Sequence, residues 1–242
     1  MVYITGDTHR DFRRVVEFCH RHNPEPGDIL VILGDAGINY FGTKESPDDD
    51  FYCDRAIKRA LSQLPLTFFC VHGNHEMRPE SIASYETVSW QGATAYAEPA
   101  FPQLLFAKDG EIYELMGKRC LVIGGAYSVD KDYRLAQGLG WWADEQPSVE
   151  IKRRVEARLV ACGWRVDIIL SHTCPRHYID LVVPFVYGGI DHGTERWLAD
   201  IEKKLDYSCW YCGHFHVDKT IPGNARYGGG KIVFMHEDFK AL

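Results

Sequence analysis

The segment Val71-His72-Gly73-Asn74-His75-Glu76 follows the apolar run Leu66–Cys70, and it is the part of the sequence that best indicates the fold. An apolar, β-prone run that ends in Gly-Asn-His-Glu predicts a strand delivering polar side chains to the carboxyl edge of a sheet. The glycine permits a sharp turn at that point. Asn74 offers an amide oxygen to a cation, His75 a titratable imidazole, and Glu76 a carboxylate able to orient either.

Four further apolar runs end in residue types that bind metal ions. The runs are Val2–Thr5, Ile29–Leu33, Val166–Leu170 and Ser208–Cys212. The polar residues that follow them are Asp7 and His9, Asp35, His172, and His214 with His216. Each residue alone has an ordinary interpretation as a turn former, a helix cap or a satisfied histidine. Because ligands of open α/β sheets gather outside the carboxyl ends of the strands, the repetition indicates one shared site.

The first 75 residues alternate between predicted strands and helices, which is typical of an α/β sheet. Asp11 is predicted to cap a helix whose apolar side chains, from Phe12 to Cys19, recur at helical spacing. Three later helices are predicted around Ile57–Leu64, Ile151–Cys162 and Trp197–Leu205, and a last strand over Lys231–Met235.

From about residue 88 the sequence becomes β-rich. Leu104–Ala107 and Ile112–Leu115 flank Asp109-Gly110, and this pattern predicts a hairpin. The segment 127–147 is rich in aromatic, charged and glycine residues without a clear period, so we expect a long excursion there. No repeat or linker interrupts the chain, and the prediction is a single domain over residues 1–242.

The composition is that of an ordinary globular protein, with 242 residues, 45% apolar and 25% charged. A net charge of −7 argues against a dedicated binder of long nucleic acid. With neither an apolar run long enough for a membrane span nor a signal peptide, and with eight scattered cysteines, we expect a cytoplasmic protein. Cys209 and Cys212 are three apart on a predicted strand, so they face opposite ways and are expected to be buried thiols.

The mixture of carboxylate, imidazole and amide ligands suits divalent ions such as Mn²⁺, Fe²⁺, Zn²⁺ or Ni²⁺. The ligands suffice for two ions if one carboxylate bridges them. Two ions roughly 3.5–4 Å apart clamp a phosphoryl group and ionise a water for in-line attack.

The order Asp-x-His, Gly-Asp, Gly-Asn-His-Glu, His and Gly-His-x-His resembles the calcineurin-like metallophosphoesterase superfamily, and the match spans residues 7–216. The resemblance implies an α/β fold, a four-layer α-β-β-α sandwich in which two mixed β-sheets pack face to face between helices. It also implies two metal ions, Mn²⁺, Fe²⁺/Fe³⁺, Zn²⁺ or Ni²⁺.

The resemblance assigns roles to individual residues. It implies that one ion is held by Asp7, His9, Asp35 and His216, and the other by Asp35, Asn74, His172 and His214. Asp35 would thus bridge the two ions. His75 would give a proton to the leaving oxygen or steady the transition state, and Glu76 would fix its orientation.

Two departures from the family pattern concern the substrate. Arg10 stands where the family usually has glycine, and the second block lacks the Asp-Arg-Gly of the protein-phosphatase branch. Arg10 either replaces the missing phosphate clamp or covers the start of the helix. Lys131 and Arg134, beside Trp141-Trp142, either form a lid that contacts substrate or belong to a loop packed on the body.

A weaker candidate for the opposite rim of the site is Tyr187–His192. Six histidines match no block and are expected to be structural or exposed. They are His20, His22, His72, His177, His192 and His236.

The sequence thus predicts a dinuclear-metal phosphoesterase acting on a phosphomonoester, phosphodiester or nucleotide, with neither membrane nor long nucleic acid as partner. The alternative from another class is a protein-interaction scaffold on the same fold, which typically loses catalytic ligands. Within the enzymes, acidity disfavours a nuclease and the missing Asp-Arg-Gly disfavours a phosphoprotein phosphatase. The oligomeric state stays open.

Overall fold

Two β-sheets form the centre of the molecule in a computed structural model that describes residues 1–42, 53–183, 189–223 and 230–242. One sheet has seven strands in the order β13-β1-β2-β3-β6-β5-β4. Its central strands β1, β2, β3 and β6 run parallel, and the outer strands pair antiparallel. The strands are β1 (Val2–Thr5), β2 (Asp28–Ile32), β3 (Leu66–Cys70), β4 (Glu86–Trp90), β5 (Ala93–Glu98), β6 (Phe101–Ala107) and β13 (Lys240–Ala241).

The second sheet has six strands in the order β11-β12-β10-β9-β8-β7, and it is also mixed. Strands β8, β9, β10 and β12 run parallel, whereas β7 and β11 are antiparallel edge strands. The strands are β7 (Ile112–Leu115), β8 (Lys118–Ile123), β9 (Ile168–Ser171), β10 (Cys209–Cys212), β11 (Lys219–Ile221) and β12 (Lys231–Phe234).

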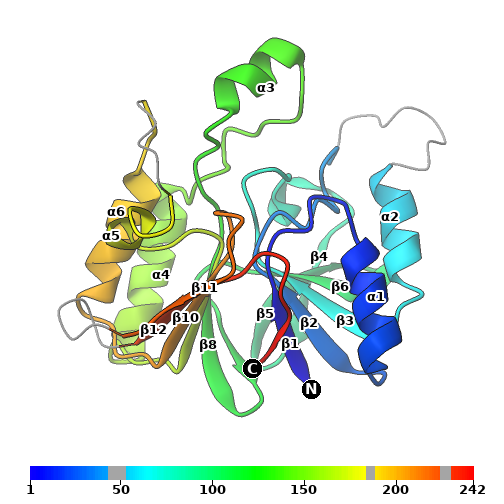
Figure 1. Cartoon of the computed structure of the whole chain (residues 1–242), viewed down its shortest axis with the longest axis horizontal. Helices are drawn as coiled ribbons and strands as arrows, with labels where there is room; N and C mark the ends of the chain where they lie inside the picture. The colour runs from blue at the N-terminus through cyan, green and yellow to red at the C-terminus, as the bar shows by residue number, and fades with distance from the viewer. Residues whose placement is uncertain (43–52, 184–188, 224–229) are drawn as a thin grey trace.

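Helices cover the outer face of each sheet (Figure 1). Helices α1 and α2 lie on the seven-stranded sheet, and α4, α5 and α6 lie on the other, while α3 projects above the body. The described helices are α1 (Arg13–His22), α2 (Asp54–Leu61), α3 (Lys131–Gln137), α4 (Val149–Ala161), α5 (Arg176–Ile179) and α6 (Gly193–Glu202), with a short 3₁₀ turn at Pro79–Ser81.

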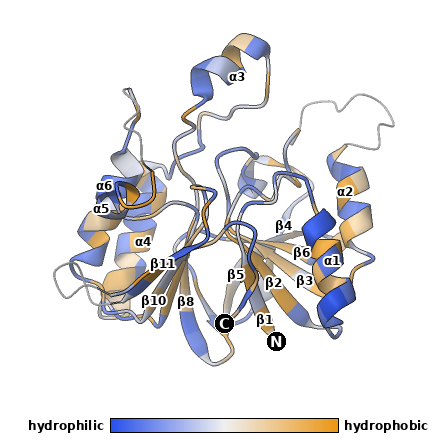
Figure 2. Ribbon diagram, viewed as in Figure 1, coloured by the Kyte–Doolittle hydropathy of each residue, from blue (hydrophilic) through white to orange (hydrophobic). Residues whose placement is uncertain are grey.

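Three apolar clusters define four layers, as the sequence resemblance predicted. Ile4 and Val31 from one sheet meet Val122 and Leu170 from the other in the central cluster. The other two clusters lie between each sheet and its helices. The hydropathy colouring shows the same division, with apolar strands inside and polar helix faces outside (Figure 2). Burial of apolar side chains on both faces accounts for the unbroken apolar runs of the central parallel strands.

The predicted hairpin between Leu104–Ala107 and Ile112–Leu115 is wrong. Strand β6 pairs with β3 and β5 in one sheet, whereas β7 pairs with β8 in the other. Asp109-Gly110 therefore lies in the crossover between sheets. The Asp109 carboxylate holds this segment in place, since it accepts the Gly124 backbone N–H at 2.6 Å and an Arg78 N–H at 2.7 Å. The hairpin of β7 turns instead at Met116-Gly117, where both residues have positive φ.

The 127–147 segment leaves the body at the end of β8 and returns to α4. It contains helix α3, which the absence of a helical period did not predict. None of the residues of α3 is buried, so the helix packs no apolar face against the core and its sequence shows no helical period. Trp141 and Trp142 are both partly buried, and the Trp141 indole donates to Glu145 Oε2 at 2.8 Å.

Four smaller predictions concern the start of α1, the cysteines, membrane-spanning helices and the predicted rim. Helix α1 begins at Arg13, and Asp11 still accepts the Arg13 backbone N–H at 3.1 Å. Cys209 and Cys212 are buried in clusters on opposite faces of their sheet, as predicted, and all eight cysteines are free. Within the described residues, no helix combines the length and the apolarity needed to cross a membrane. Tyr187 and Gly188 of the predicted rim lie outside the described residues.

Candidate metal centre

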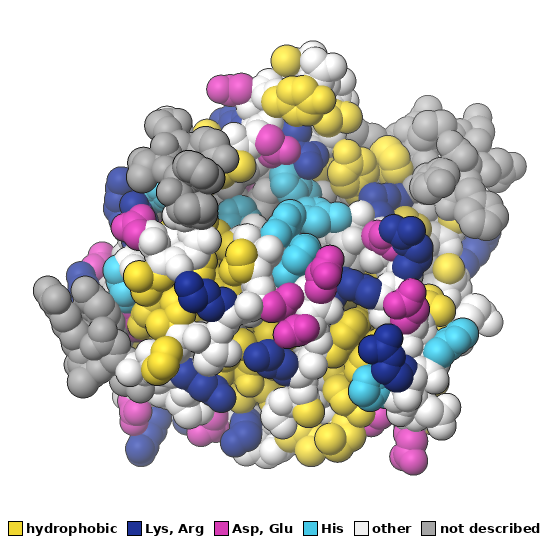
Figure 3. Space-filling view, viewed as in Figure 1, with side chains coloured by type: hydrophobic (Ala, Val, Ile, Leu, Met, Phe, Trp, Pro, Cys, Tyr) yellow, Lys and Arg dark blue, Asp and Glu magenta, His cyan; other side chains and the backbone are white. Residues whose placement is uncertain are grey.

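The predicted ligands lie together at the carboxyl ends of parallel strands from both sheets. Asp7, Asp35 and Asn74 follow β1, β2 and β3, while His172 follows β9 and His214 and His216 follow β10. The space-filling view shows histidines gathered next to acidic side chains at the middle of this face, below α3 (Figure 3). Two sheets that pack face to face therefore supply one cluster at the carboxyl ends of their parallel strands.

Two overlapping groups have metal-binding distances. In the first, ligand atoms of Asp7, His9 and His216 lie within 4.8 Å of one another, and in the second those of Asp7, Asp35 and His172 do. The groups share Asp7. Asp35 Oδ2 is 3.6 Å from His172 Nε2 of its own group and 3.9 Å from His9 Nε2 of the other. His214 adjoins the second group, with its ring centroid 4.9 Å from that of His172.

The hydrogen bonds around His172 show that its free nitrogen faces a site for a cation. The Leu33 carbonyl is 2.8 Å from Nδ1 and only accepts, so Nδ1 carries a hydrogen, and the Nδ1–H tautomer of the ring presents a lone pair at Nε2. Nε2 lies 2.7 Å from Asn74 Oδ1, which also presents lone pairs. Two acceptors at this distance repel unless a cation or a proton lies between them, and the donor set therefore fits a metal ion.

A chain of buried hydrogen bonds fixes the orientation of the Asn74 amide. Ser128 Oγ donates its hydrogen to Glu145 Oε2 at 2.5 Å, so it can only accept from Asn74 Nδ2, which lies 2.9 Å away. The amide oxygen must then face His172. Sequence reasoning missed Ser128 and Glu145. Within the predicted excursion, only their burial distinguishes them from ordinary loop residues.

The charge states of the cluster also suit cations. Burial favours a raised pKa for Asp7, but the hydrogen bond of His216 and the nearby His172 hold it below its usual range. Burial likewise opposes ionisation of Asp35, but the nearby imidazoles of His172, His75 and His9 together hold its pKa below the usual value. Burial lowers the pKa of His214 to about 3. Ionised carboxylates and neutral imidazoles are the forms that bind metal ions.

The backbone at the cluster is strained. Four ligands adopt left-handed conformations, with φ of 44° at His9, 48° at Asp35, 68° at His214 and 51° at His216. Such conformations cost roughly 1–3 kcal/mol each in non-glycine residues and concentrate at functional sites. They show that the surrounding fold holds these side chains in place against a local conformational cost.

Glycines let ligand side chains lie directly on the backbone. At Gly34, where φ is 95°, a Cβ atom would be 2.1 Å from Nδ1 of His172. At Gly73 it would be 2.0 Å from Oδ1 of Asp35. Any larger residue at either position would displace a predicted ligand, which explains the Gly-Asp and Gly-Asn-His patterns in physical terms.

His75 lies at the edge of the cluster and meets the 127–147 segment. Its Nε2 is 3.9 Å from Asp130 Oδ1, and its backbone N–H donates to Asp35 Oδ1 at 2.8 Å. Burial lowers the pKa of His75, while Asp35 offsets part of this effect. Arg134 donates to Asp130 Oδ2 at 2.8 Å and to the Gly140 carbonyl at 3.1 Å. The Asp130 carboxylate therefore lies between the Arg134 guanidinium and the His75 ring.

Glu76 and Arg10 have partners other than those the sequence suggested. The Glu76 carboxylate is fully buried and accepts backbone N–H bonds from Gly37 at 3.0 Å and Gly73 at 3.3 Å, so its bonds go to the loops rather than the His75 ring. Burial raises the pKa of Glu76 to about 8, with Asp35 contributing. It therefore organises the loops that carry Asp35 and Asn74.

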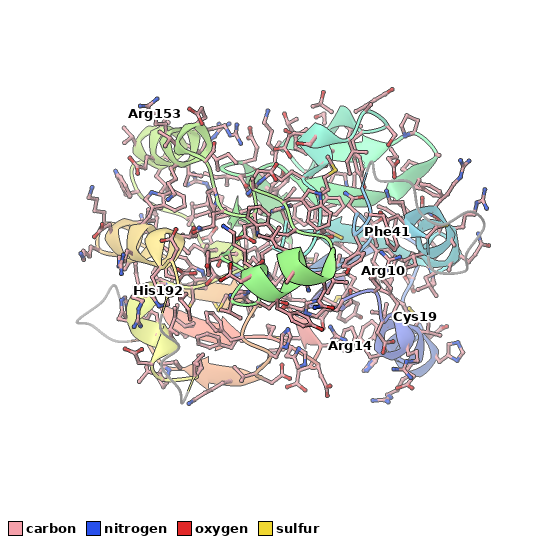
Figure 4. The ribbon with its side chains drawn as sticks, turned by 90° about the horizontal axis from the view of Figure 1, so that it is seen from above. Arg10, Arg14, Cys19, Phe41, Arg153 and His192 are labelled. Carbon is pink, nitrogen blue, oxygen red and sulfur yellow. The ribbon has the colours of Figure 1, made fainter. Side chains whose placement is uncertain are left out.

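Arg10 turns toward α2. Its Nη1 donates to Asp54 Oδ1 and to the Gly37 carbonyl, both at 2.6 Å, and the guanidinium lies over the rings of Tyr40 and Phe41. Figure 4 shows Arg10 beside Phe41, on the opposite side of the molecule from His192. Lys131 Nζ lies 4.4 Å from the centroid of the Trp141 ring. Contacts of Arg10, Lys131 and Arg134 with a phosphate stay predictions.

A cavity of about 490 Å³ opens beside the cluster. Sequence reasoning missed most of its wall away from the ligands, although His192 and Ile190 fall in the rim candidate Tyr187–His192. The other unassigned histidine near the ligands is His236, whose ring stacks on His216 at 4.7 Å. Three further lining residues, Tyr127, Val129 and Asp130, lie in the predicted 127–147 segment. The lining residues outside both predicted segments and the ligand blocks are Arg176, Ile179, Asp180, Val183, Glu195 and Phe215.

The family is decided by a sequence comparison over most of the chain. A family model described as calcineurin-like phosphoesterase matches residues 1–218. The chain belongs to this family. Calcineurin-like phosphoesterases are metal-dependent, and the clustered carboxylates and imidazoles of this chain agree with that property.

Outside its family model, this calcineurin-like phosphoesterase shows distant similarity to a protein of known structure. No curated protein matches the sequence. The crystal structure of phosphopantetheinyl hydrolase from Mycobacterium tuberculosis is similar over 97% of this chain and 89% of that chain, at 15% identity and a TM-score of 0.45.

Proposed function

We propose that the chain is a dinuclear-metal phosphoesterase that hydrolyses a small phosphorylated substrate, a phosphomonoester, phosphodiester or nucleotide. The observation that carries the proposal is the position of Asp35 Oδ2, between His172 Nε2 at 3.6 Å and His9 Nε2 at 3.9 Å. Asp35 Oδ2 thus lies near one imidazole of each proposed ligand set, as a carboxylate that bridges two adjacent cations would.

The residues divide as the resemblance implies. Asp7, His9, Asp35 and His216 would hold one ion, and Asp35, Asn74, His172 and His214 the other, drawn from Mn²⁺, Fe²⁺/Fe³⁺, Zn²⁺ or Ni²⁺. When bound, such ions polarise phosphoryl oxygens and lower the pKa of a coordinated water.

His75 is the proton donor in this proposal. Its ring adjoins the ligand group, with its centroid 5.6 Å from that of His9, and its Nε2 lies near the cavity-lining Asp130. Burial lowers the pKa of His75, while the carboxylates of Asp35 and Asp130 act against that effect and favour the imidazolium form, which would donate a proton to the leaving oxygen. All predicted ligands are present, which favours an enzyme over a scaffold that has lost them.

The test is metal-dependent hydrolysis by the whole chain. Protein stripped with a chelator is assayed with nitrophenyl phosphate and bis-nitrophenyl phosphate before and after addition of Mn²⁺, Zn²⁺ or Fe²⁺. We expect activity only after metal addition, and its loss in Asp7→Asn, with His20→Ala on the exposed side of α1 as the control. Hydrolysis that is unchanged by chelation, or absent with every ion and ester, overturns the proposal.

A further inference from the structure

We infer that the substrate of this phosphoesterase is a phosphate ester of an uncharged, largely apolar alcohol, and that the alcohol binds in the cavity beside the ligand cluster. The inference rests on the proposed function and adds the substrate class. It comes from the composition of the cavity wall, which the ligand motifs do not determine.

The cavity joins the ligand cluster to an apolar wall. Its volume of about 490 Å³ falls within the usual range of small-molecule sites. Its lining includes five residues of the cluster, Asp35, Asn74, His75, His214 and His216. The apolar side chains of the remaining wall are Tyr127, Val129, Ile179, Val183, Ile190 and Phe215.

The apolar surface begins directly at the ligands. Phe215 lies between His214 and His216 in the sequence, and its ring centroid is 5.0 Å from that of His214 and 5.6 Å from that of Phe234. A phosphoryl group at the cluster therefore has an aromatic surface as its immediate neighbour. An alcohol attached to that group must either contact this surface or leave it in water.

Val129 extends the apolar wall on the side of the 127–147 segment. Its side chain lines the cavity, although 64% of the residue is exposed to solvent. An exposed valine at the wall of a cavity has no packing role in the core, and a bound apolar group would cover it. The residue is therefore a specificity element that can be changed without disturbing the fold.

Charges in the wall disfavour a second anionic group on the substrate. Arg176 donates to Asp180 at 2.8 Å, so this cation already has an anionic partner. Glu195 is 3% exposed, and its Oε2 has no hydrogen-bond partner among residues 1–42, 53–183, 189–223 and 230–242. Asp130 is likewise paired, because Arg134 donates to its Oδ2 at 2.8 Å. The described wall away from the ligands therefore offers no unpaired arginine or lysine to an alcohol that carries a carboxylate or a further phosphate.

The experiment measures binding of alkylphosphonates, which present the phosphoryl group but are not esters. Calorimetry with Mn²⁺-loaded protein compares methyl-, butyl- and hexylphosphonate with 5-carboxypentylphosphonate. Burial of a methylene group predicts about a four-fold gain in affinity per carbon along the alkyl series, equivalent to ~0.8 kcal/mol. The carboxylate-ended analogue is expected to bind at least about ten-fold more weakly than hexylphosphonate.

Two matched variants locate the effect. Val129→Ser is expected to weaken hexylphosphonate by about three- to ten-fold and to leave methylphosphonate unchanged. Leu135→Ser is the control, because Leu135 is also exposed, at 53%, lies on the same segment, and is not among the described lining residues. It should leave both affinities unchanged.

Equal affinity for all chain lengths, tight binding of the carboxylate-ended analogue, or equal effects of the two variants overturns the inference. So does failure of every phosphonate to bind. Chain-length-dependent binding together with absent hydrolysis of the corresponding alkyl phosphates would overturn the proposed function instead, while supporting the ligand class. The two failures are therefore distinguishable.

Discussion

The side-chain amide of Asn74 donates a hydrogen bond to Ser128 Oγ at 2.9 Å. This bond links the Gly-Asn-His-Glu block after β3 to the start of the 127–147 segment. Ser128 is fully buried, and its own hydrogen goes to Glu145 at the far end of the same segment. The segment therefore sets which atom of the Asn74 amide faces His172.

Loss of the Ser128 hydroxyl should loosen the metal centre. Ser128→Ala removes the acceptor for Asn74 Nδ2 and leaves the amide free to turn, so Mn²⁺ affinity is expected to fall about 10- to 100-fold. Titration calorimetry measures the affinity. Ser84→Ala is the control, since the exposed Ser84 hydroxyl donates to Glu98 at 2.6 Å, away from the ligands. Unchanged Mn²⁺ affinity in Ser128→Ala would contradict this role.

Asp35→Asn should reduce the occupancy of both metal positions at once. A neutral amide cannot balance two divalent charges as a carboxylate between two ligand groups does. Metal content per chain after gel filtration is the measurement, and we expect fewer than two ions at equilibrium. A variant that retains two ions per chain would show that Asp35 does not bridge them.

His75→Ala should slow catalysis while both metal ions remain bound. Loss of a general acid predicts a decrease in kcat of roughly 10²–10⁴-fold. The decrease should be smaller for nitrophenyl esters than for alkyl esters, because an acidic leaving group needs little protonation. If both classes of ester lose the same factor, His75 acts by positioning or charge rather than as a proton donor.

Glu202 should make stability depend on pH. Burial raises its pKa from 4.5 to about 7, and the Tyr178 and Tyr207 hydroxyls donate to its Oε1 at 2.9 and 2.5 Å. The folded chain therefore binds more protons than the unfolded chain between these pH values. The contribution to stability is present below about pH 4.5 and is lost as the pH rises through about 7.

Glu202→Gln keeps the acceptor oxygen and removes this titration. The difference in unfolding free energy between variant and native chain should grow in favour of the variant from pH 5 to pH 8. Urea unfolding at several pH values measures it. Glu156→Gln, which alters a glutamate whose Oε1 accepts from Trp197 at an exposed position, should show no such trend. A difference that is flat with pH would contradict the prediction.

The strand-end blocks could be predicted from the sequence because strand, turn and ligand are adjacent in the chain. Asp7, Asp35 and Asn74 needed only the rule that parallel strands of one sheet end at the same edge. The ligand blocks from two different sheets could be joined only through the family resemblance, since nothing local indicates that β3 and β9 lie in separate layers. The described residues confirm that layered arrangement.

Features that depend on distant partners could not be predicted. Asp109-Gly110 matches a hairpin locally, but the strands on its two sides pair in different sheets, so it lies in a crossover that Asp109 fixes by its bonds to Arg78 and Gly124. Helix α3 has no buried face and therefore no periodic signal. Ser128 and Glu145 resemble ordinary loop residues until tertiary structure places them behind Asn74.

The division of the ligands between the sheets has a consequence for cooperativity. Asp7, Asp35 and Asn74 follow strands of the seven-stranded sheet, and His172, His214 and His216 follow strands of the six-stranded sheet. An ion held by both sets adds a cross-link between two layers that otherwise adhere through apolar contacts and a few hydrogen bonds, such as that between His172 and the Leu33 carbonyl. Amide hydrogens of β2 and β9 should then exchange at a common slow rate in loaded protein and at separate rates after chelation, so the metal centre would decide whether the two layers unfold as one unit.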